Sequence, residues 1–221
     1  MSKLPTDEST DAGREAPQPR PVRADAQRNI EALLAAALAV FVTSGVDAPV
    51  REIAEKAGVG IGTLYRHFPQ RADLIVAVFR HQIDACADAA AVLAAHHAPG
   101  EALALWMQRY ADLITTKRGL ATALHTGDPA FNTLPTYFDT RLRPALGALL
   151  DAAAKAGEVR SDIAPDDLLS AVRSLCMSAH NDRPDYARRM VALLVDGLRY
   201  GVNSAVNTPS PPASTDSKHP N

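Results

Sequence analysis

Residues 50–74 read VREIAEKAGVGIGTLYRHFPQRADL, which is the most informative stretch of the chain. Ile53, Ala54 and Ala57 recur at the spacing of one helix face, which predicts a short amphipathic helix. Gly58 follows, and glycine allows the left-handed backbone with which many helices end. The segment therefore predicts two short helices joined by a tight turn, with a further helix after them.

The second short helix has one apolar side and one polar side. Leu64 and Phe68 are four residues apart and are expected to point inward together. The opposite side then carries hydroxyl, guanidinium and imidazole groups, which suit the base edges and phosphates of the DNA major groove. These outward residues are Thr63, Tyr65, Arg66 and His67.

The segment resembles the helix-turn-helix of TetR-type transcriptional regulators, whose signature is approximately A-x-x-A-G-V-S-x-G-T-L-Y-x-H-F-x-x-K-x-x-L. With the preceding helix the resemblance covers about 50 residues. Gly60 replaces the usual serine, so the recognition helix lacks a side-chain cap. Arg71 replaces the usual lysine and keeps the positive charge. The positions that agree are Ala54, Ala57, Gly58, Val59, Gly62, Thr63, Leu64, Tyr65, His67, Phe68 and Leu74.

The resemblance implies a set of DNA-binding residues. The first turn of the recognition helix would approach the bases, the Tyr65 hydroxyl would contact a phosphate, and Arg71 would lie nearby. Ala48 and Pro49 stand where the family often has a serine or threonine, so one phosphate contact fewer is expected. The implied DNA-binding residues are Ile61, Gly62, Thr63, Tyr65, Arg66, His67 and Arg71.

Composition predicts an all-α fold of about nine helices. Hydrophobic residues make up 47% of the 221 residues and aromatic residues only 5%, with abundant alanine. The net charge of −2 argues against a protein that binds nucleic acid over most of its surface. It permits one small DNA-binding surface with a local cluster of basic residues. Four regions are expected: a disordered arm (1–22), a helix-turn-helix DNA-binding domain (23–70), a helical ligand-binding and dimerisation domain (71–202) and a disordered tail (203–221).

Helical periodicity and breaker residues divide the two central regions further. Asp47 or Ala48 is expected to cap the second helix, with Pro49 in its first turn. Pro144 either lies within one helix or separates a short helix from a longer one. The helices are expected at about 24–44, 70–95, 101–116, 119–125, 134–156, 165–180 and 185–202, in addition to the two short ones.

The last two helices are strongly apolar and have two interpretations. They pack inside the monomer, or they form a four-helix bundle with a second copy. The TetR resemblance favours the dimer, because such proteins bind palindromic operators as two-fold dimers. Glycines four residues apart would let a partner helix approach closely. The last helix places Met190, Leu193, Leu194, Gly197, Leu198 and Gly201 on one side.

The middle helices hold most of the aromatic and soft side chains. Each is more often a core residue than a ligand contact, but together they suit a pocket for an apolar or aromatic small-molecule effector. Residues 116–120 and 156–162 resemble, more weakly, the C-terminal domain of a TetR subgroup common in actinobacteria. The candidate ligand-binding residues are Trp106, Met107, Tyr110, Leu124, Tyr137, Phe138, Cys176 and His180.

Other classes of function have little support. The apolar run 32–42 is too short to span a bilayer, and the acidic N-terminus is not a secretory signal, so a cytoplasmic protein without a membrane partner is expected. Adjacent His96 and His97 cannot easily share a metal, and no metal or cofactor is expected. No catalytic motif is found, so the chain is not expected to be an enzyme.

The favoured function is a ligand-responsive repressor that binds double-stranded operator DNA as a homodimer and is released by a small molecule. Activator action is left open. The rival is a small-molecule-binding or scaffold protein whose helix-turn-helix makes protein contacts, and the outward Thr63, Tyr65, Arg66 and His67 argue against it.

Overall fold

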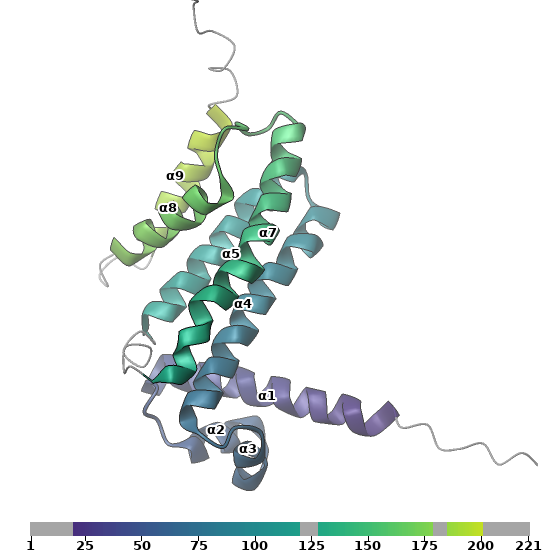
Figure 1. Ribbon diagram of the computed structural model, residues 1–221, viewed down its shortest axis with the longest axis vertical. Helices are drawn as coiled ribbons and strands as arrows, with labels where there is room; N and C mark the ends of the chain where they lie inside the picture. Colours follow the sequence, from purple (N-terminus) through teal and green to yellow (C-terminus); the bar gives the residue numbers. More distant parts are fainter. Residues whose placement is uncertain (1–19, 120–127, 179–184, 201–221) are drawn as a thin grey trace, which may run out of the picture.

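The computed structural model describes residues 20–119, 128–178 and 185–200, and every regular element in these ranges is a helix, which confirms the all-α fold. Figure 1 shows a small group of helices at one end and long helices rising from it. In chain order the elements are α1 (Arg20–Ser44), α2 (Val50–Ala57), α3 (Ile61–His67), α4 (Arg71–His96), α5 (Pro99–Gly119), the 3-10 helix η1 (Pro129–Thr133), α7 (Leu134–Lys155), α8 (Pro165–Ser178) and α9 (Tyr186–Tyr200).

Helices α1, α2 and α3 lie at one end of the molecule, together with the start of α4. This group, here called the head, has its own core. Leu33, Ala37 and Phe41 lie four residues apart on α1 and are all buried. Ile53 of α2 and Leu64 of α3 are buried in the same cluster. Removing these apolar surfaces from water fixes α2 and α3 relative to α1.

The larger body is a bundle in which α4, α5 and α7 run alongside one another, with α8 and α9 packed at the end far from the head (Figure 1). Its core is built around Trp106 and Tyr110. The two cores meet along α4, where Phe79 packs with the head and Ile83 with the bundle. One rigid helix therefore belongs to both bodies, and the boundary expected between residues 70 and 71 falls where this helix begins.

Several helix ends differ from expectation by a few residues. Helix α1 begins at Arg20, four residues before the expected Ala24. Helix α2 begins at Val50, because Pro49 has a ψ of 132° and is the N-cap instead of a first-turn residue. Helix α4 begins at Arg71, after Gln70, which forms a capping box with Asp73. The short helix expected at 119–125 lies outside the described residues, apart from Gly119, which ends α5.

Helix α7 is continuous through Pro144, so of the two alternatives left open by the sequence the single helix is the one found. Pro144 is exposed, while Leu142 and Leu146 on either side are buried. The backbone carbonyl that loses its hydrogen bond at a helical proline belongs to the residue four positions earlier, here Thr140, which is also exposed. Water can satisfy a carbonyl on this side, and the apolar packing on the other side keeps the helix in place.

The core-facing side of α9 differs from the one expected. The buried residues are Ala187, Val191, Val195 and Leu198. Leu198 is therefore the one fully buried member of the expected set, whereas Leu193 is 64% exposed. Apolar residues extend around more of α9 than one face, so periodicity alone did not show which part meets the bundle. The expected set also includes Leu194, which is half-buried, Gly197, which is exposed, and Gly201, which lies outside the described residues.

Helix α1 contains the one described segment, Ala26–Ser44, whose length and composition would allow it to cross a membrane. A core helix of a water-soluble body passes the same test. Leu33, Ala37, Val40 and Phe41 are each at most 2% exposed in the head core. Packing in the head therefore accounts for the apolar residues on the buried side of α1.

Candidate DNA-reading surface and effector core

The turn between α2 and α3 has the geometry that the sequence predicted. Gly58 has a φ of +69°, in the left-handed region. The Gly58 N–H donates to Glu55 O at 3.1 Å, and the Val59 N–H donates to Ala54 O at 3.0 Å. These two bonds form the helix-ending pattern known as the Schellman motif. Val59 is half-buried against the head core and fixes the angle at which the chain enters α3.

Helix α3 is held by two apolar residues and presents most of its other residues to solvent. Leu64 is 1% exposed and Phe68 is 9% exposed. Gly60 is the N-cap, and no side chain caps the helix, as its sequence predicted. The exposed residues are Ile61 (47%), Gly62, Tyr65 (49%), Arg66 and His67, and Thr63 is half-buried.

The first turn of α3 is open toward solvent. A Cβ added at Gly62 would meet no atom within 4 Å beyond its chain neighbours and the adjacent backbone of α3. The backbone at this position can therefore come close to another surface. The exposed Tyr65 hydroxyl and Arg66 guanidinium belong to the turn that follows. A short helix with an open first turn and basic groups at its end fits the dimensions of a DNA major groove.

The Arg71 side chain has partners inside the protein. Its two terminal nitrogens donate to carbonyls of the turn between α1 and α2: Nη1 to Val46 O, and Nη2 to Ala48 O at 2.7 Å. The residue is half-buried. The sequence predicted a phosphate contact for Arg71, and that contact stays a prediction. The bonds to the turn were not expected, since their acceptors lie more than 20 residues earlier in the chain.

Five of the candidate ligand-binding residues lie together in the bundle core. Trp106 and Tyr110 stack with ring centroids 5.7 Å apart, and Phe138 lies 5.9 Å from Tyr110. The Trp106 indole donates to Cys86 O at 2.8 Å, and the Tyr110 hydroxyl donates to Leu169 O at 3.2 Å. Met107 and Cys176 are also buried, whereas Leu124 and His180 lie outside the described residues.

Burial changes the acid–base behaviour of this core. Removal from water raises the pKa of Cys86 from 9.0 to about 12. The pKa of Tyr110 rises from 10.0 to about 12, mainly through burial, although Arg173 opposes the rise. Both groups therefore stay neutral at physiological pH. The aromatic cluster presents an apolar environment to anything that enters it.

Arg173 is a functional candidate that the sequence reasoning missed. Its guanidinium carbon lies 5.4 Å from the centre of the Phe138 ring, a distance typical of a cation–π contact. Its positive charge also lies near the Tyr110 side chain and favours ionisation of the hydroxyl, which lowers the Tyr110 pKa. The aromatic cluster therefore has a cation at its α8 edge. Arg173 lies four residues after Leu169, whose carbonyl Tyr110 contacts, but only the fold shows that α8 meets α5 there.

A polar network joins α4 to α7 beside the same core. The Tyr137 hydroxyl lies 2.7 Å from both Asp84 carboxylate oxygens. Arg141 donates to Asp84 at 2.6 Å and to Asp88 at 2.7 Å. Burial and the hydrogen bond to Asp84 raise the pKa of Tyr137. Tyr137, expected to contact ligand, therefore ties two helices together in this structure.

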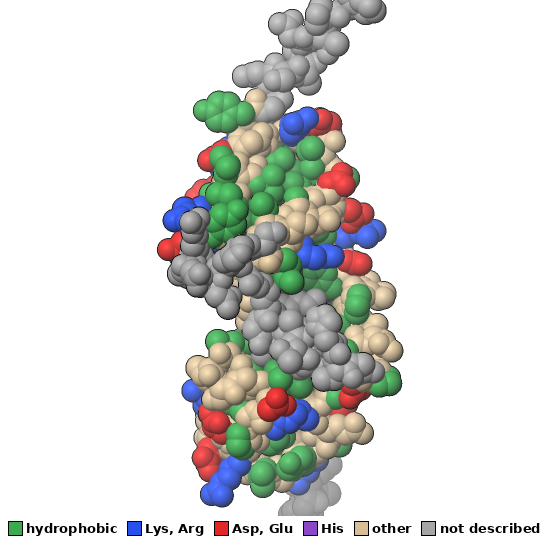
Figure 2. Space-filling model, turned by 90° about the vertical axis from the view of Figure 1, so that its left-hand side faces the viewer, with side chains coloured by type: hydrophobic (Ala, Val, Ile, Leu, Met, Phe, Trp, Pro, Cys, Tyr) green, Lys and Arg blue, Asp and Glu red, His purple; other side chains and the backbone are tan. Residues whose placement is uncertain are grey.

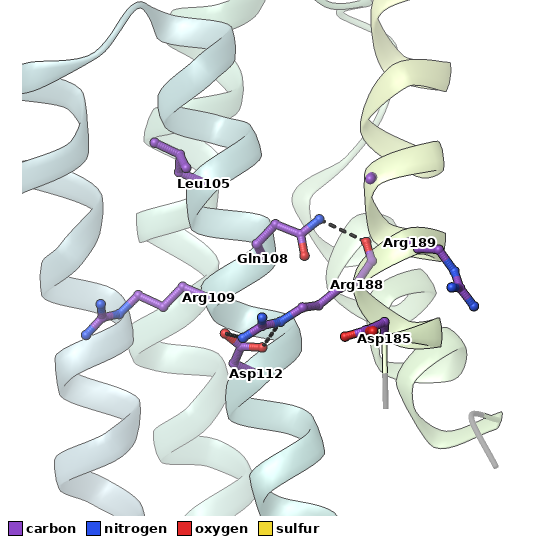
Figure 3. A pocket seen from close by; sticks show the side chains of 8 residues that line it. Leu105, Gln108, Arg109, Asp112, Asp185, Arg188 and Arg189 are labelled. Carbon is purple, nitrogen blue, oxygen red and sulfur yellow. Dashed lines mark hydrogen bonds and ion pairs between the residues drawn. The ribbon is translucent and has the colours of Figure 1, made fainter. Parts of the chain in front are cut away.

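A concave feature lies apart from the aromatic core, between α5 and α9. Figure 3 shows Arg188 reaching across to Asp112, where its Nε and Nη2 each donate to one carboxylate oxygen at 2.9 Å. The Gln108 side-chain amide donates to the Arg188 backbone carbonyl at 3.0 Å. This open groove has a volume of about 580 Å³. Five of its eight lining residues are charged, which differs from the apolar pocket that the sequence predicted. The lining residues are Leu105, Gln108, Arg109, Asp112, Asp185, Arg188, Arg189 and Ala192.

Within the described ranges, no group of three or more histidine, cysteine, aspartate or glutamate side chains could hold a metal ion. The arrangement that does stand out is a helix-turn-helix head joined by α4 to a helical bundle. This arrangement defines a DNA-binding regulator with a second, helical domain.

Comparison with known proteins identifies the family. Residues 33–78 match the model described as bacterial regulatory proteins of the tetR family. Residues 98–200 match the C-terminal domain described as transcriptional regulator SbtR-like. The chain belongs to the TetR family of bacterial transcriptional regulators. These DNA-binding regulators also bind small-molecule ligands and are typically dimers.

Solved structures show the same fold. A TetR transcriptional regulator from Streptomyces coelicolor is 40% identical over 77% of this chain and 98% of its own, with a TM-score of 0.68. One from Mycobacterium vanbaalenii is 36% identical over 81% and 99%, with a TM-score of 0.63. An ArpA-like gamma-butyrolactone receptor, at 24% identity over 82% and 93% with a TM-score of 0.54, shares the fold alone. No protein of curated function matches the sequence significantly.

Proposed function

We propose that this regulator is a repressor that binds a palindromic operator as a homodimer and leaves it when a small molecule binds the bundle. The observation that carries the proposal is the outward side of α3. Leu64 and Phe68 fix the helix, while Ile61, Gly62, Tyr65, Arg66 and His67 are exposed. We place this activity in the cytoplasm, where operator DNA is accessible.

The proposed contacts divide into two kinds. Ile61, Gly62 and Thr63 in the first turn approach base edges and select the sequence. The Tyr65 hydroxyl and the Arg66 and His67 side chains bind phosphates and set the register. Helix α2 lacks a side-chain cap, so its first turn offers backbone N–H groups and no hydroxyl to the DNA.

The outer side of α9 supports the homodimer. Leu193 is 64% exposed, Tyr200 is 86% exposed, and Gly197 has open space where a Cβ would be. Figure 2 shows hydrophobic side chains gathered over the half of the molecule far from the head, bordered by charged groups. A second copy packing α8 and α9 against this side would form a four-helix bundle and bury it. Two-fold symmetry would place two recognition helices on one face of the DNA, about one helical turn apart.

The effector is proposed to enter the aromatic core between α4, α5, α7 and α8. The Trp106, Tyr110 and Phe138 rings suit an apolar or aromatic molecule, and Arg173 at the edge suits an acidic group on it. These rings are almost fully buried, so a ligand must move the surrounding helices to enter. The ligand releases DNA only if it binds the displaced arrangement more tightly.

The proposal is tested first by selecting bound duplexes from random and host DNA. A reader of DNA loses affinity steeply with added salt, because each phosphate contact releases a counterion. Metabolites are then screened for release of the selected operator. The rival scaffold function predicts no selected sequence and no steep dependence on salt.

Tyr65→Phe tests the reading side without disturbing the fold. The ring stays and the hydroxyl goes, so the melting temperature should be unchanged. Affinity should fall about tenfold, on the selected operator and on random duplex alike, because a phosphate contact carries no sequence information. An unchanged dissociation constant at moderate salt would remove Tyr65 from the proposed contacts.

A further inference from the structure

Arg71 ties the start of α4 to the turn that precedes α2. Arg71 is the first residue of α4. Its Nη1 donates to Val46 O, and its Nη2 donates to Ala48 O at 2.7 Å. Both acceptors belong to the segment between the end of α1 at Ser44 and the start of α2 at Val50. The guanidinium of Arg71 therefore binds two carbonyls of the same turn. It can do so because it is planar and presents several N–H donors in a fixed arrangement.

Ala48 is buried in the head core and Val46 packs against it, but few other polar contacts hold this turn. Pro49 is the N-cap of α2 and supplies no side-chain hydrogen bond. Ala48 N–H donates to Gly45 O at a long 3.3 Å, and the exposed Ser44 hydroxyl reaches Glu52 at 3.3 Å. Charge-assisted bonds are stronger than neutral ones, so the Arg71 contacts are the strongest polar link between the turn and the rest of the head.

We propose that Arg71 is a positioning residue, which holds α2, and through α2 the recognition helix, at a fixed angle to α4. This inference rests on the proposed DNA-binding function. The turn sets where α2 begins, and the Gly58–Val59 corner sets how α3 follows. With both ends of this unit fixed, movement of α4 carries the recognition helix with it.

A phosphate contact by Arg71 makes different predictions. A side chain that binds phosphate contributes about one unit to the slope of log affinity against log salt. Its loss weakens binding to all duplexes equally and leaves the unbound head unchanged. A positioning residue contributes nothing to the slope. Its loss loosens the turn in the absence of DNA and weakens the operator more than random duplex.

The test compares Arg71→Gln with Arg66→Gln, a matched loss of one exposed guanidinium from the recognition helix. In the full-length protein without DNA, Arg71→Gln should speed hydrogen exchange about tenfold over residues 45–57, and Arg66→Gln should not. On the selected operator, Arg71→Gln should lose about tenfold in affinity with an unchanged salt slope. Arg66→Gln should lower the steepness of the slope by about one.

Arg71→Lys is the second variant and carries the test if Arg71→Gln does not fold. Lysine keeps the charge but donates from one nitrogen, so positioning predicts faster exchange of the turn and reduced operator affinity. A phosphate contact predicts exchange and affinity like those of the original protein. Unchanged exchange, or a less steep salt slope in Arg71→Gln, overturns the inference. If the original protein binds no duplex, the proposed function fails, and the exchange experiment alone decides the role of Arg71.

Discussion

Gly62 is the residue at which the needs of the helix and of the DNA surface differ most clearly. It is exposed in the first turn of α3, and a Cβ there would meet no atom within 4 Å beyond its chain neighbours and the adjacent helix backbone. Glycine inside a helix is less stable than alanine by about 0.5–1 kcal/mol. A chain selected only for stability would therefore carry alanine, and the open backbone suggests close approach to DNA.

Substitutions at Gly62 should separate stability from DNA binding. Gly62→Ala should raise the free energy of unfolding by about 0.5–1 kcal/mol, measured by urea denaturation. Gly62→Leu should abolish binding to the selected operator with little change in melting temperature, because its side chain extends into the groove. If Gly62→Leu binds the operator normally, α3 does not read the bases.

Cys86 and Tyr110 should make the protein less stable in alkali. Their folded pKa values are both about 12, whereas unfolded chains ionise near 9.0 and 10.0. The unfolded state therefore releases protons first, and stability falls as pH rises from 9 toward 12. Each group contributes up to about 1.4 kcal/mol per pH unit while only its unfolded form is ionised.

Cys86→Ala isolates one of the two contributions. Urea denaturation at several values between pH 8 and pH 11 should show a smaller loss of stability in the variant than in the original protein. Tyrosines and lysines elsewhere titrate in both proteins and cancel in the comparison. Equal pH dependence of the two proteins would show that Cys86 ionises as readily when folded as when unfolded.

Among the elements, α9 has a buried side and an exposed side, and the proposed dimer uses the exposed one. Ala187, Val191, Val195 and Leu198 pack against the bundle, so they belong to the folding of one chain. Leu193 and Gly197 face away from it and remain available to a partner. The division matters for experiments, because a charge on the wrong side unfolds the chain instead of separating two copies.

Leu193→Arg should separate the proposed dimer while preserving the fold. Leu193 is 64% exposed, so arginine costs little in the monomer, but a paired interface would bury its charge unpaired. Size-exclusion chromatography with light scattering should show a monomer with unchanged helical circular dichroism. Val92→Arg, at a 60% exposed position on α4, is the control and should leave the assembly intact. A stable Leu193→Arg dimer would place the interface elsewhere.

In the whole molecule, α4 joins the head to the bundle core, and so connects the proposed DNA-reading surface to the proposed effector site. It begins at the Arg71 contacts in the head, and its middle accepts the Trp106 indole bond at Cys86. The Tyr137 and Arg141 contacts to Asp84 join it to α7. A ligand that parts α5 or α7 from α4 would therefore disturb bonds on the helix that carries the head.

Trp106→Phe should weaken this link and the fold together. The Cys86 carbonyl would lose its donor while remaining buried, which costs about 1–3 kcal/mol in the free energy of unfolding. Operator affinity well below the melting temperature should be nearly unchanged, while the response to effector should weaken. Denaturation and duplex binding measure the two effects. A variant as stable as the original protein would show that the indole bond contributes little.

The sequence by itself determined the head and the fold class. The α2–turn–α3 pattern depends on residues close together in the chain, namely Ile53 and Ala54, Gly58, and Leu64 with Phe68. Helix periodicity and the left-handed backbone of glycine are local effects, so the local sequence reveals them. The resemblance to the TetR signature added the expected function on the same residues.

The tertiary structure decided what depends on residues far apart in the chain. Arg71 reaches carbonyls 23 and 25 residues earlier, and Trp106 reaches one 20 residues earlier. Arg173 meets Phe138 only because α8 folds back over α7. Periodicity shows that a helix has an apolar side but not which neighbour covers each part of it. Packing of the helices decides which side of α9 is buried and which carbonyls Arg71 binds. Only packing brings these donors, acceptors and apolar surfaces together.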